Sequence, residues 1–262
     1  MKKKITVLAA LILTGIFLFP VLFTVYCSFV KDPGGYGIMG TFFKKFSLVG
    51  YYDILVEEAW YLRGFWNSVC YAAVITVFNT IISVFAAYAF FEAEFRGKGV
   101  LYFFYIILMM MPLQVTMLPN YIGLRDMQLL DTRLALILPG IFTPFGVFLM
   151  GQYMRGLDRS ILEAVRLETK SILCIVFHIA LPQVKTCVAA LFLFTFAENW
   201  NLVEQPQIFL KTVDKQPLSV LIAAQEGAGG LFAGCVIFMI PVVILSLYFH
   251  GSLEDGLGSL KL

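Results

Sequence analysis

The chain has few charged residues. Only 14% of its 262 residues are charged, against about 25% in an ordinary soluble domain, while 60% are hydrophobic. This balance excludes an ordinary soluble enzyme and an intrinsically disordered chain. The formal net charge of +2 leaves no basic surplus of the kind that nucleic-acid binding requires, so no nucleic acid is expected as a partner. We therefore expect lipid to surround most of the chain.

Residues that build metal sites and disulfides are also scarce. The two histidines, His178 and His250, have no full ligand set at zinc-binding spacing, although Glu254 follows His250 by four residues. The five cysteines form no C-x-x-C pair and fall in or beside apolar runs, as packing residues do. A nucleotide-binding G-x-x-x-x-G-K-[ST] loop is missing as well. Enzyme chemistry is therefore not visible, and uphill transport would need energy from another chain.

Long runs without charged side chains dominate the rest of the sequence. Five runs exceed the ~20 residues that a membrane-spanning helix needs. They cover residues 5–30, 64–91, 99–124, 134–154 and 227–253. A sixth run, 172–200, contains Lys185 and Glu198, so we place its span at 182–200, with Lys185 near one membrane surface. The sequence thus predicts an all-α membrane protein with six transmembrane helices.

Six spans place both termini on the same side of the membrane. With the termini inside, the inner segments carry ten basic residues in about half the length of the outer loops, which carry eight. We therefore expect cytoplasmic N- and C-termini. Three lysines precede the first apolar run, as in a signal peptide, but no small-residue cleavage site follows it. We interpret residues 1–30 as a retained first helix.

Most of the predicted spans contain proline, which removes a backbone donor and bends a helix. The spans also contain or adjoin polar side chains: Asn67, Ser68, Asn79, Thr80, Gln114, Thr116, Asn120, Glu198 and Asn199. Such groups face the interior of a bundle, where they pair across helices or line water, and pairing is the expected role for most. Bent helices alone do not distinguish a transport path from an ordinary membrane bundle. No ionisable residue lies clearly at the centre of a span, which argues against an ion-coupled carrier.

The segment between the fourth and fifth spans, residues 155–171, is the longest on the inner side. Ser160 followed by Glu163 forms a capping-box pattern, so a short helix is expected to begin there. At helical spacing, one side carries Ile161, Ala164, Val165 and Glu168, and a charged flank carries Arg159, Glu163 and Arg166. These residues alone fit either a helix that lies on the bilayer or one that docks in a protein groove.

The same segment carries a family resemblance. E-A-V-R-L-E-T at residues 163–169, followed by I-A-L-P at 179–182, resembles the cytoplasmic loop of the membrane subunits of ATP-binding-cassette (ABC) importers, whose pattern is E-A-A-x-x-D-G and then I-x-L-P. Further matching pieces follow in order along the chain, at residues 67–68, 86–90, 95–99, 111–116, 119, 134–139, 145–150, 199–201 and 216–220. Together they resemble the carbohydrate-uptake branch, in particular the second permease subunit of maltose-type and glycerol-phosphate-type importers.

The chain departs from the family pattern within the loop itself, at Val165, Glu168, Thr169 and Lys170. The family has a glycine at the position of Thr169, which turns the chain between two short helices. A side chain makes that turn costlier. We therefore expect a straighter loop or an altered fit to the ATPase.

The resemblance implies one transmembrane domain over residues 1–262, in the cytoplasmic membrane of a bacterium or archaeon. Its parts are a first helix (1–30), an outer loop (31–66), a five-helix core (67–250) that contains the cytoplasmic coupling loop (155–171), a second outer loop (198–230) and a cytoplasmic tail (251–262). The implied partners are a second homologous permease subunit, two cytoplasmic ATP-binding subunits, an extracytoplasmic solute-binding protein and membrane lipid. The chain itself is expected to bind no cofactor and no metal, because ATP and Mg are used by the partner ATPase.

The resemblance also implies which residues dock the ATPase, namely Glu163, Ala164, Arg166, Glu168 and Thr169. Glu163 is expected to pair with an ATPase arginine and Ala164 to pack closely against the ATPase. Arg166 is expected to make a supporting contact.

On the outer side, the candidate contacts with the translocation path or the binding protein are Gln114, Glu198, Asn199, Trp200 and Asn201. An aromatic face can stack on a sugar ring and amides can satisfy its hydroxyls. Trp200 also fits an anchor at the membrane edge, and we favour the anchor because the partner permease is expected to hold most of the sugar contacts.

We therefore expect a subunit that imports sugars or oligosaccharides and is not itself an enzyme. The alternatives are a permease for another solute such as a glycerol phosphate, an ion-coupled secondary transporter, and a membrane scaffold that transports nothing. Inverted repeats and a midplane charge, which a secondary transporter should show, are not visible in the sequence. Only the resemblance argues against a scaffold.

Overall fold

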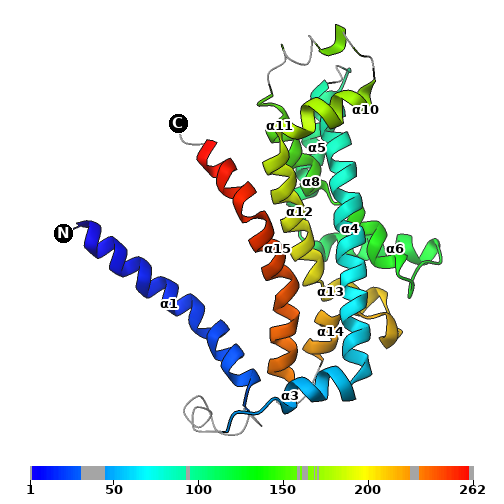
Figure 1. Ribbon diagram of the computed structural model, residues 1–262. Helices are drawn as coiled ribbons and strands as arrows, with labels where there is room; N and C mark the ends of the chain where they lie inside the picture. The colour runs from blue at the N-terminus through cyan, green and yellow to red at the C-terminus, as the bar shows by residue number, and fades with distance from the viewer. Residues whose placement is uncertain are drawn as a thin grey trace. The chain divides into compact units, whose positions relative to one another are not determined.

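The computed structural model describes residues 2–30, 45–92, 95–157, 160, 165–167, 169, 171–224 and 230–259. These residues are helical apart from turns, short irregular links and an isolated bridge between Val30 and Phe46. The helices (Figure 1) are α1 (Lys2–Ser28), α3 (Val49–Tyr52), α4 (Ala59–Glu92), α5 (Lys98–Met110), α6 (Leu113–Asp126), α7 (Leu134–Ile141), α8 (Pro144–Met154), α10 (Ile172–Ile175), α11 (Leu181–Gln183), α12 (Lys185–Trp200), α13 (Glu204–Phe209), α14 (Leu218–Ala223) and α15 (Leu231–Ser259). Shorter turns are the π-helical η2 (Asp53–Glu57) and η3 (Val176–Ala180) and the 3-10 turn η4 (Val213–Lys215). An all-helical fold is thus confirmed for the described residues.

Four described segments are long and apolar enough to cross a membrane: Thr6–Ser28, Ala59–Glu92, Leu134–Met154 and Leu231–Gly251. Two pairs of helices meet the same criterion together but bend at a break, α5 with α6 by 103° and Ile172–Gln183 with α12 by 86°. The described chain therefore has four candidate spans, or six if each bent pair is one span. The longest helix within the sixth apolar run is α12. It begins at Lys185, close to the start that the sequence predicts at Pro182.

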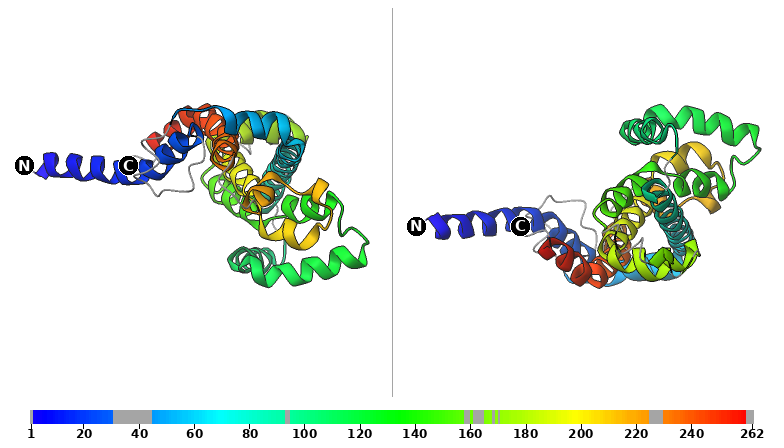
Figure 2. Two further views of the ribbon diagram at one scale, coloured as in Figure 1. Left: turned by 90° about the horizontal axis from the view of Figure 1, so that it is seen from below. Right: turned by 90° about the horizontal axis from the view of Figure 1, so that it is seen from above.

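A proline lies at the break in the third predicted span. Met111 is extended and Pro112 follows it, so α5 ends at Met110 and α6 begins at Leu113. The residue before a proline is disfavoured in the helical conformation, which explains why the helix stops there. Figure 2 shows that the two helices run in different directions: α5 is seen nearly end-on, while α6 lies across the view. The run 99–124 is therefore bent rather than continuous.

The chain divides into two compact units, and the first comprises Met1–Trp66 and Leu218–Pro241. Its core contains Ile54, Tyr61, Leu218 and Ala233, and the Tyr61 hydroxyl donates to the carbonyl oxygen of Gly234 at 2.8 Å. Residues 6–22 of α1 are all exposed, as expected of a helix whose sides face lipid, whereas Cys27 and Ser28 at its end are buried.

The second unit comprises Asn67–Pro217 and Val242–Leu262, and it is built along α4. Near the start of this stretch, Tyr71 and Ile75 join a cluster that includes Leu136 of α7 and Phe209 of α13. Further along α4 a second cluster follows, formed by Val84, Ala87, Tyr88, Met150, Met154, Ile175, Val176, Ala180, Val184, Cys187 and Leu191. The second cluster holds α4, α8 and α12 together. It brings the end of α4 beside the ends of α8 and the helices that follow the predicted coupling loop.

Buried polar side chains on α4 complete the packing of the second unit. The amide nitrogen of Asn79 donates to the carbonyl oxygen of Ile141 and to Oγ1 of Thr143, each at 2.9 Å. These acceptors lie at the break between α7 and α8, where Pro144 has no N–H to donate. The prediction that polar groups inside the spans pair across helices is confirmed for Asn79.

Candidate functional site

The predicted docking residues lie partly outside the described chain. Glu163, Ala164 and Glu168 are not among the described residues, whereas Arg166 and Thr169 are. The described residues Ser160 and 165–167 are helical, while the capping-box prediction involves Glu163 and so lies outside the described residues. Together with Arg166 and Thr169, they show how the segment is attached to the rest of the chain.

Arg166 is attached to the end of α4 by an ion pair with Glu92. The side chain of Glu92 is 22% exposed and that of Arg166 is 46% exposed, so the pair is half-sheltered from solvent. An arginine guanidinium is planar and holds a carboxylate in a defined direction. The pair therefore connects the predicted coupling loop to a long helix of the core. Nothing in the sequence pattern shows this partner, which lies 74 positions earlier.

Thr169 turns the chain without the strained conformation that its position suggests. Among the described non-glycine residues only Gln128 and Asp131 have a positive φ, so Thr169 does not adopt the left-handed conformation that favours glycine. Its backbone N–H donates to the carbonyl oxygen of Val165 at 2.9 Å, and its hydroxyl accepts from the N–H of Ser171 at 3.2 Å. A threonine hydroxyl commonly closes a turn in this way.

A cavity of about 650 Å³ lies beside the ion pair. Glu92, Arg166 and Thr169 line it together with apolar residues of α4 and α10, including Phe85 and Ile175. Beside this cavity, Val165 packs against the core cluster of α4, α8 and α12, whereas Leu167 is 91% exposed. An exposed leucine next to the predicted docking residues is a further candidate for contact with a partner. The sequence analysis did not single it out, although its apolar side chain follows Arg166 directly.

The end of α12 carries the second group of predicted site residues. Glu198 and Asn201 are exposed, and Asn199 is buried. The amide of Asn199 donates to the carbonyl oxygen of Thr195, and that of Asn201 to the carbonyl oxygen of Ala197, each at 2.8 Å. Both amides therefore hold the last turn of their own helix, and Glu198 and Asn201 are the members of this group that face outward.

The ring of Trp200 is fully buried and stacks on Phe196 at 5.7 Å between ring centroids. An anchor at the membrane edge and a stacking face for a sugar both require an exposed ring. Neither contact is open to Trp200 in this conformation. The sequence contained one sign of this burial. Phe196 precedes Trp200 by one helical turn, and side chains four positions apart lie on the same face of a helix.

Gln114 is exposed on the first turn of α6. Its amide nitrogen lies 3.4 Å from Oε2 of Glu204 on α13, a long hydrogen bond, and it lines a shallow cavity of about 380 Å³ with Tyr121 and Ile208. Among the described residues, Gln114 forms no hydrogen bond with the end of α12. The structure thus connects Gln114 to α13, which follows the group around Asn199 along the chain.

Asp131 organises the turn that follows α6, and the sequence analysis missed it. Its carboxylate accepts hydrogen bonds from the hydroxyl and the N–H of Thr212 and from the N–H of Lys211, and Lys215 lies within 3.5 Å. These donors, the Thr212 hydroxyl first, hold the pKa of Asp131 well below its usual range. Asn67 reaches the same stretch, since its amide donates to the carbonyl oxygens of Asp214 and Gln216. The loop after α13 is therefore fixed to α4 and to the turn before α7.

Within the described residues, no group of three or more histidine, cysteine, aspartate or glutamate side chains is placed to hold a metal ion. The groups that the described sites present are ion pairs, amides and exposed apolar side chains.

Comparison with known proteins identifies the family. Residues 79–258 match the family described as "Binding-protein-dependent transport system inner membrane component". This range includes the predicted coupling loop, both predicted groups of site residues and Glu92.

Several curated relatives are similar over most of their length. The arabinooligosaccharides transport system permease protein AraQ of Halalkalibacterium halodurans is 31% identical over 209 residues, covering 78% of this chain and 75% of that protein. The lactose transport system permease protein LacG of Rhizobium radiobacter is 26% identical over 75% of this chain and 74% of that protein. The sn-glycerol-3-phosphate transport system permease protein UgpE of Escherichia coli K12 is 27% identical over 77% of this chain and 74% of that protein.

A solved structure has the same fold. The crystal structure of a bacterial ABC transporter involved in the import of the acidic polysaccharide alginate contains a chain that matches with a TM-score of 0.82 at 21% identity, over 96% of this chain and 97% of that one. The resemblance found in the sequence is confirmed: the chain belongs to the family of binding-protein-dependent transport system inner membrane components, as a multi-pass ABC-importer permease subunit and not an enzyme.

Proposed function

We propose that this permease forms half of the translocation path of an ATP-driven importer for sugars or oligosaccharides. The observation that carries the proposal is the 31% identity to an arabinooligosaccharide permease over 78% of the chain. The lactose permease supports the same cargo class. The glycerol-3-phosphate permeases, at 27% identity, define the alternative cargo and rank below the arabinooligosaccharide relative.

The assembly that we propose contains this chain, a second homologous permease subunit, two cytoplasmic ATP-binding subunits and an extracytoplasmic solute-binding protein. The family description, which names binding-protein-dependent transport, supports it. Counting each bent helix pair as one span gives six spans, which would place both termini on the same side, and we propose that this side is the cytoplasm. We propose that ATP and Mg bind to the partner ATPase and that this chain holds no cofactor.

Residues 155–171 are proposed to form the coupling loop. Glu163 pairs with an ATPase arginine, Ala164 packs against the ATPase, and Glu168 and Thr169 complete the docking segment. Arg166 supports this docking surface by holding the loop to α4, because its guanidinium already pairs with Glu92. Closure of the ATPase pair on ATP then moves the loop, and the ion pair passes the movement to α4.

On the outer side, the exposed side chains of Gln114, Glu198 and Asn201 are proposed to contact the solute-binding protein or the passing sugar. Asn199 and Trp200 support this surface by shaping the end of α12, since both are buried.

The first test addresses coupling to an ATPase. The tagged permease is purified from its native membrane, co-purifying subunits are identified, and ATP hydrolysis is measured with and without Glu163→Ala. We expect an ATP-binding subunit to co-purify, and we expect the substitution to release it or to abolish transport-coupled hydrolysis. Glu57→Ala, at an exposed position outside the loop, is the matched control. A permease that purifies alone and drives uptake from an ion gradient would refute the proposal.

The second test addresses the cargo. Uptake into vesicles that contain the complete importer is measured with labelled arabinooligosaccharide, lactose and sn-glycerol-3-phosphate. ATP-dependent uptake of a sugar supports the proposal. ATP-dependent uptake of the glycerol phosphate alone contradicts the sugar assignment and leaves the permease assignment standing.

A further inference from the structure

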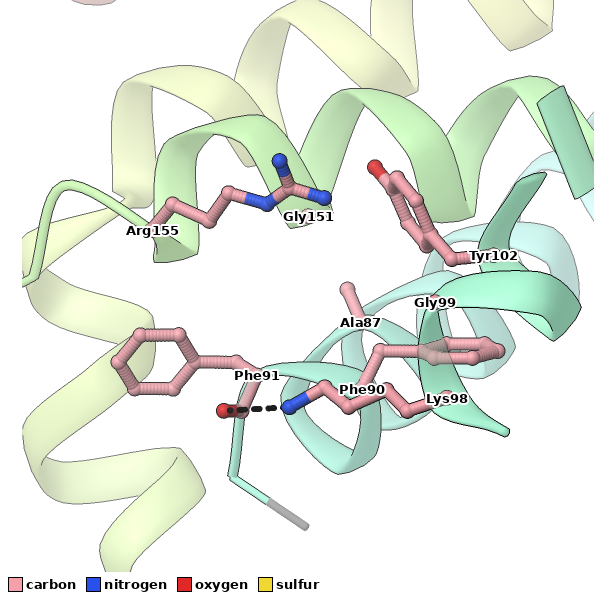
Figure 3. Close-up of a pocket in the computed structure, with 8 residues that line it drawn as sticks. All are labelled: Ala87, Phe90, Phe91, Lys98, Gly99, Tyr102, Gly151 and Arg155. Carbon is pink, nitrogen blue, oxygen red and sulfur yellow. Dashed lines mark hydrogen bonds between the residues drawn. The ribbon is translucent and has the colours of Figure 1, made fainter. Parts of the chain in front are cut away.

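A third cavity lies where α4 ends, α5 begins and α8 ends, and it has a volume of about 360 Å³. Figure 3 shows Arg155 and Tyr102 on one side of this cavity and Lys98, Phe90 and Phe91 on the other. The walls thus combine two cations with three aromatic rings. The cavity is separate from the one beside the Glu92–Arg166 ion pair, and the proposed coupling mechanism does not use it.

The two cations of this cavity have no acidic partner among the described residues. Arg155 places its guanidinium carbon 4.6 Å from the centroid of the Tyr102 ring, a cation–π contact that leaves its N–H groups without an acceptor in that part of the chain. Lys98 makes one long hydrogen bond, 3.4 Å from Nζ to the carbonyl oxygen of Phe91. An ammonium has three donors, so at least two remain for another acceptor. The hydroxyl of Tyr102 is buried and has no hydrogen-bond partner among the described residues.

The start of α5 adds further donors to this cavity. The helix begins at Lys98 after Gly97, which has a positive φ and provides no side-chain cap. Of the N–H groups of the first helical turn, that of Lys98 donates to the carbonyl oxygen of Phe95 at 3.2 Å, whereas those of Gly99, in the cavity wall, and Val100 have no acceptor among the described residues and lie at the positive end of the helix dipole. Lys98, Arg155 and the N–H groups of Gly99 and Val100 are all suited to one anionic group with several oxygen atoms.

The surroundings of the cavity identify the class of anion. The ends of α4 and α8 and the start of α5 fall on the inner side in the topology proposed above, so the cavity lies at the level of the lipid headgroups. From this point α5 continues with exposed apolar side chains, including Val100, Phe103 and Phe104. A free anion gains no binding energy from an apolar surface. A lipid can pack its acyl chain against these side chains of α5 and place its phosphate between Lys98 and Arg155.

We propose that this cavity binds the phosphate of an anionic phospholipid of the inner leaflet, held by Lys98 and Arg155. The aromatic rings of Phe90 and Tyr102 cover the glycerol part of the headgroup. This proposal rests on the proposed orientation of the permease but not on the identity of the cargo. The bound lipid joins the ends of three helices close to the coupling loop.

The test measures lipid retained by the purified permease complex. The complex is placed in nanodiscs of phosphatidylcholine with a minor fraction of phosphatidylglycerol, extracted in mild detergent, and examined by native mass spectrometry. We expect preferential retention of phosphatidylglycerol. We expect Lys98→Gln and Arg155→Gln each to weaken retention about fivefold, and the double substitution to weaken it about 30-fold. The matched control is Arg125→Gln with Lys211→Gln, which removes the same charge at exposed positions outside the cavity.

Several outcomes would overturn the proposal. Equal retention by the double variant and by its matched control is one, and equal retention of the zwitterionic lipid is another. Displacement of the lipid by millimolar inorganic phosphate would assign the cavity to a free anion. A crosslink from Lys98→Cys to a partner subunit in the assembled complex would assign it to a protein. Because retention is measured without ATP or sugar, a failed transport assay does not affect the result.

Discussion

Reversing the two charges of the Glu92–Arg166 ion pair tests whether the coupling loop acts through α4. In the variant Glu92→Arg two positive charges meet, and in Arg166→Glu two negative charges meet. Each single change is expected to push the loop away from the end of α4. The double variant restores an ion pair of opposite direction at the same place, so it should restore the attachment.

The size of the effect follows from the exposure of the two side chains. At 22% and 46% exposure the pair is neither a free surface contact nor a buried one. We assign it about 1 kcal/mol, at the upper end of measured values for partly exposed pairs. That energy corresponds to about a fivefold change in an equilibrium. Repulsion in the single variants adds a comparable amount, so each should lower ATP-dependent uptake by about fivefold to 30-fold, and the double variant should recover most of the loss.

Uptake and ATP hydrolysis are measured on the same reconstituted importer, because a coupling defect changes their ratio while a folding defect lowers both. Asp126→Arg is the control: Asp126 pairs with its neighbour Arg125, both side chains are largely exposed, and little effect is expected. If the double variant is as inactive as the single variants while its subunits still co-purify, the ion pair is not the connection that we describe.

Three further predictions concern the packing and the outer turn. Asn79→Leu should lower the thermal stability of the permease in detergent by about 0.6–1.7 kcal/mol, because the carbonyl groups at the α7–α8 break lose their donor; an unchanged melting curve would contradict this. Gly146→Ala should destabilise by about 1–3 kcal/mol, because a Cβ there meets Oγ of Ser83, whereas Gly123→Ala, with no atom within 4 Å, should not. Asp131→Ala should speed hydrogen exchange in the stretch 211–215. In the unchanged protein, the contribution of Asp131 to this protection is complete above about pH 5, begins to decline below about pH 4, where the unfolded chain takes up a proton, and is lost only as the pH falls through the lowered pKa of the folded carboxyl group. Complete loss of the Asp131-dependent protection already at pH 4 would contradict this assignment.

Residue patterns predict the helical part of the fold well. Apolar runs locate the helices because a helix that crosses the bilayer must be apolar along its length. Proline locates the breaks because it cannot donate a backbone hydrogen bond. The degree of bending was not predictable, because Pro112 ends a helix while Pro241 lies inside α15 without ending it. Which of these occurs depends on whether neighbouring groups satisfy the freed carbonyls.

The predicted site was less accessible from the pattern. The sequence places Arg166 on a charged flank, but its partner Glu92 is brought to it only by packing of the second core cluster. Trp200 is aromatic at the end of an apolar helix, which fits an anchor, and only the fold shows that its ring is covered. Local patterns report the side of a helix on which a residue lies. They do not report what another helix places against that side.

The length of α4 explains how one subunit could connect the two surfaces that we propose to be inner and outer. From Asn67 to Glu92 the helix contains no proline, and at 1.5 Å per residue it is about 38 Å long, the thickness of a membrane. Asn67 holds the outer stretch around Asp214, Asn79 holds the break between α7 and α8, and Glu92 holds the proposed coupling loop. A straight helix moves as a unit, whereas a bent pair such as α5 and α6 can change its angle. Movement of the coupling loop is therefore expected to reach the outer turn through α4, while the bent pairs adjust around it.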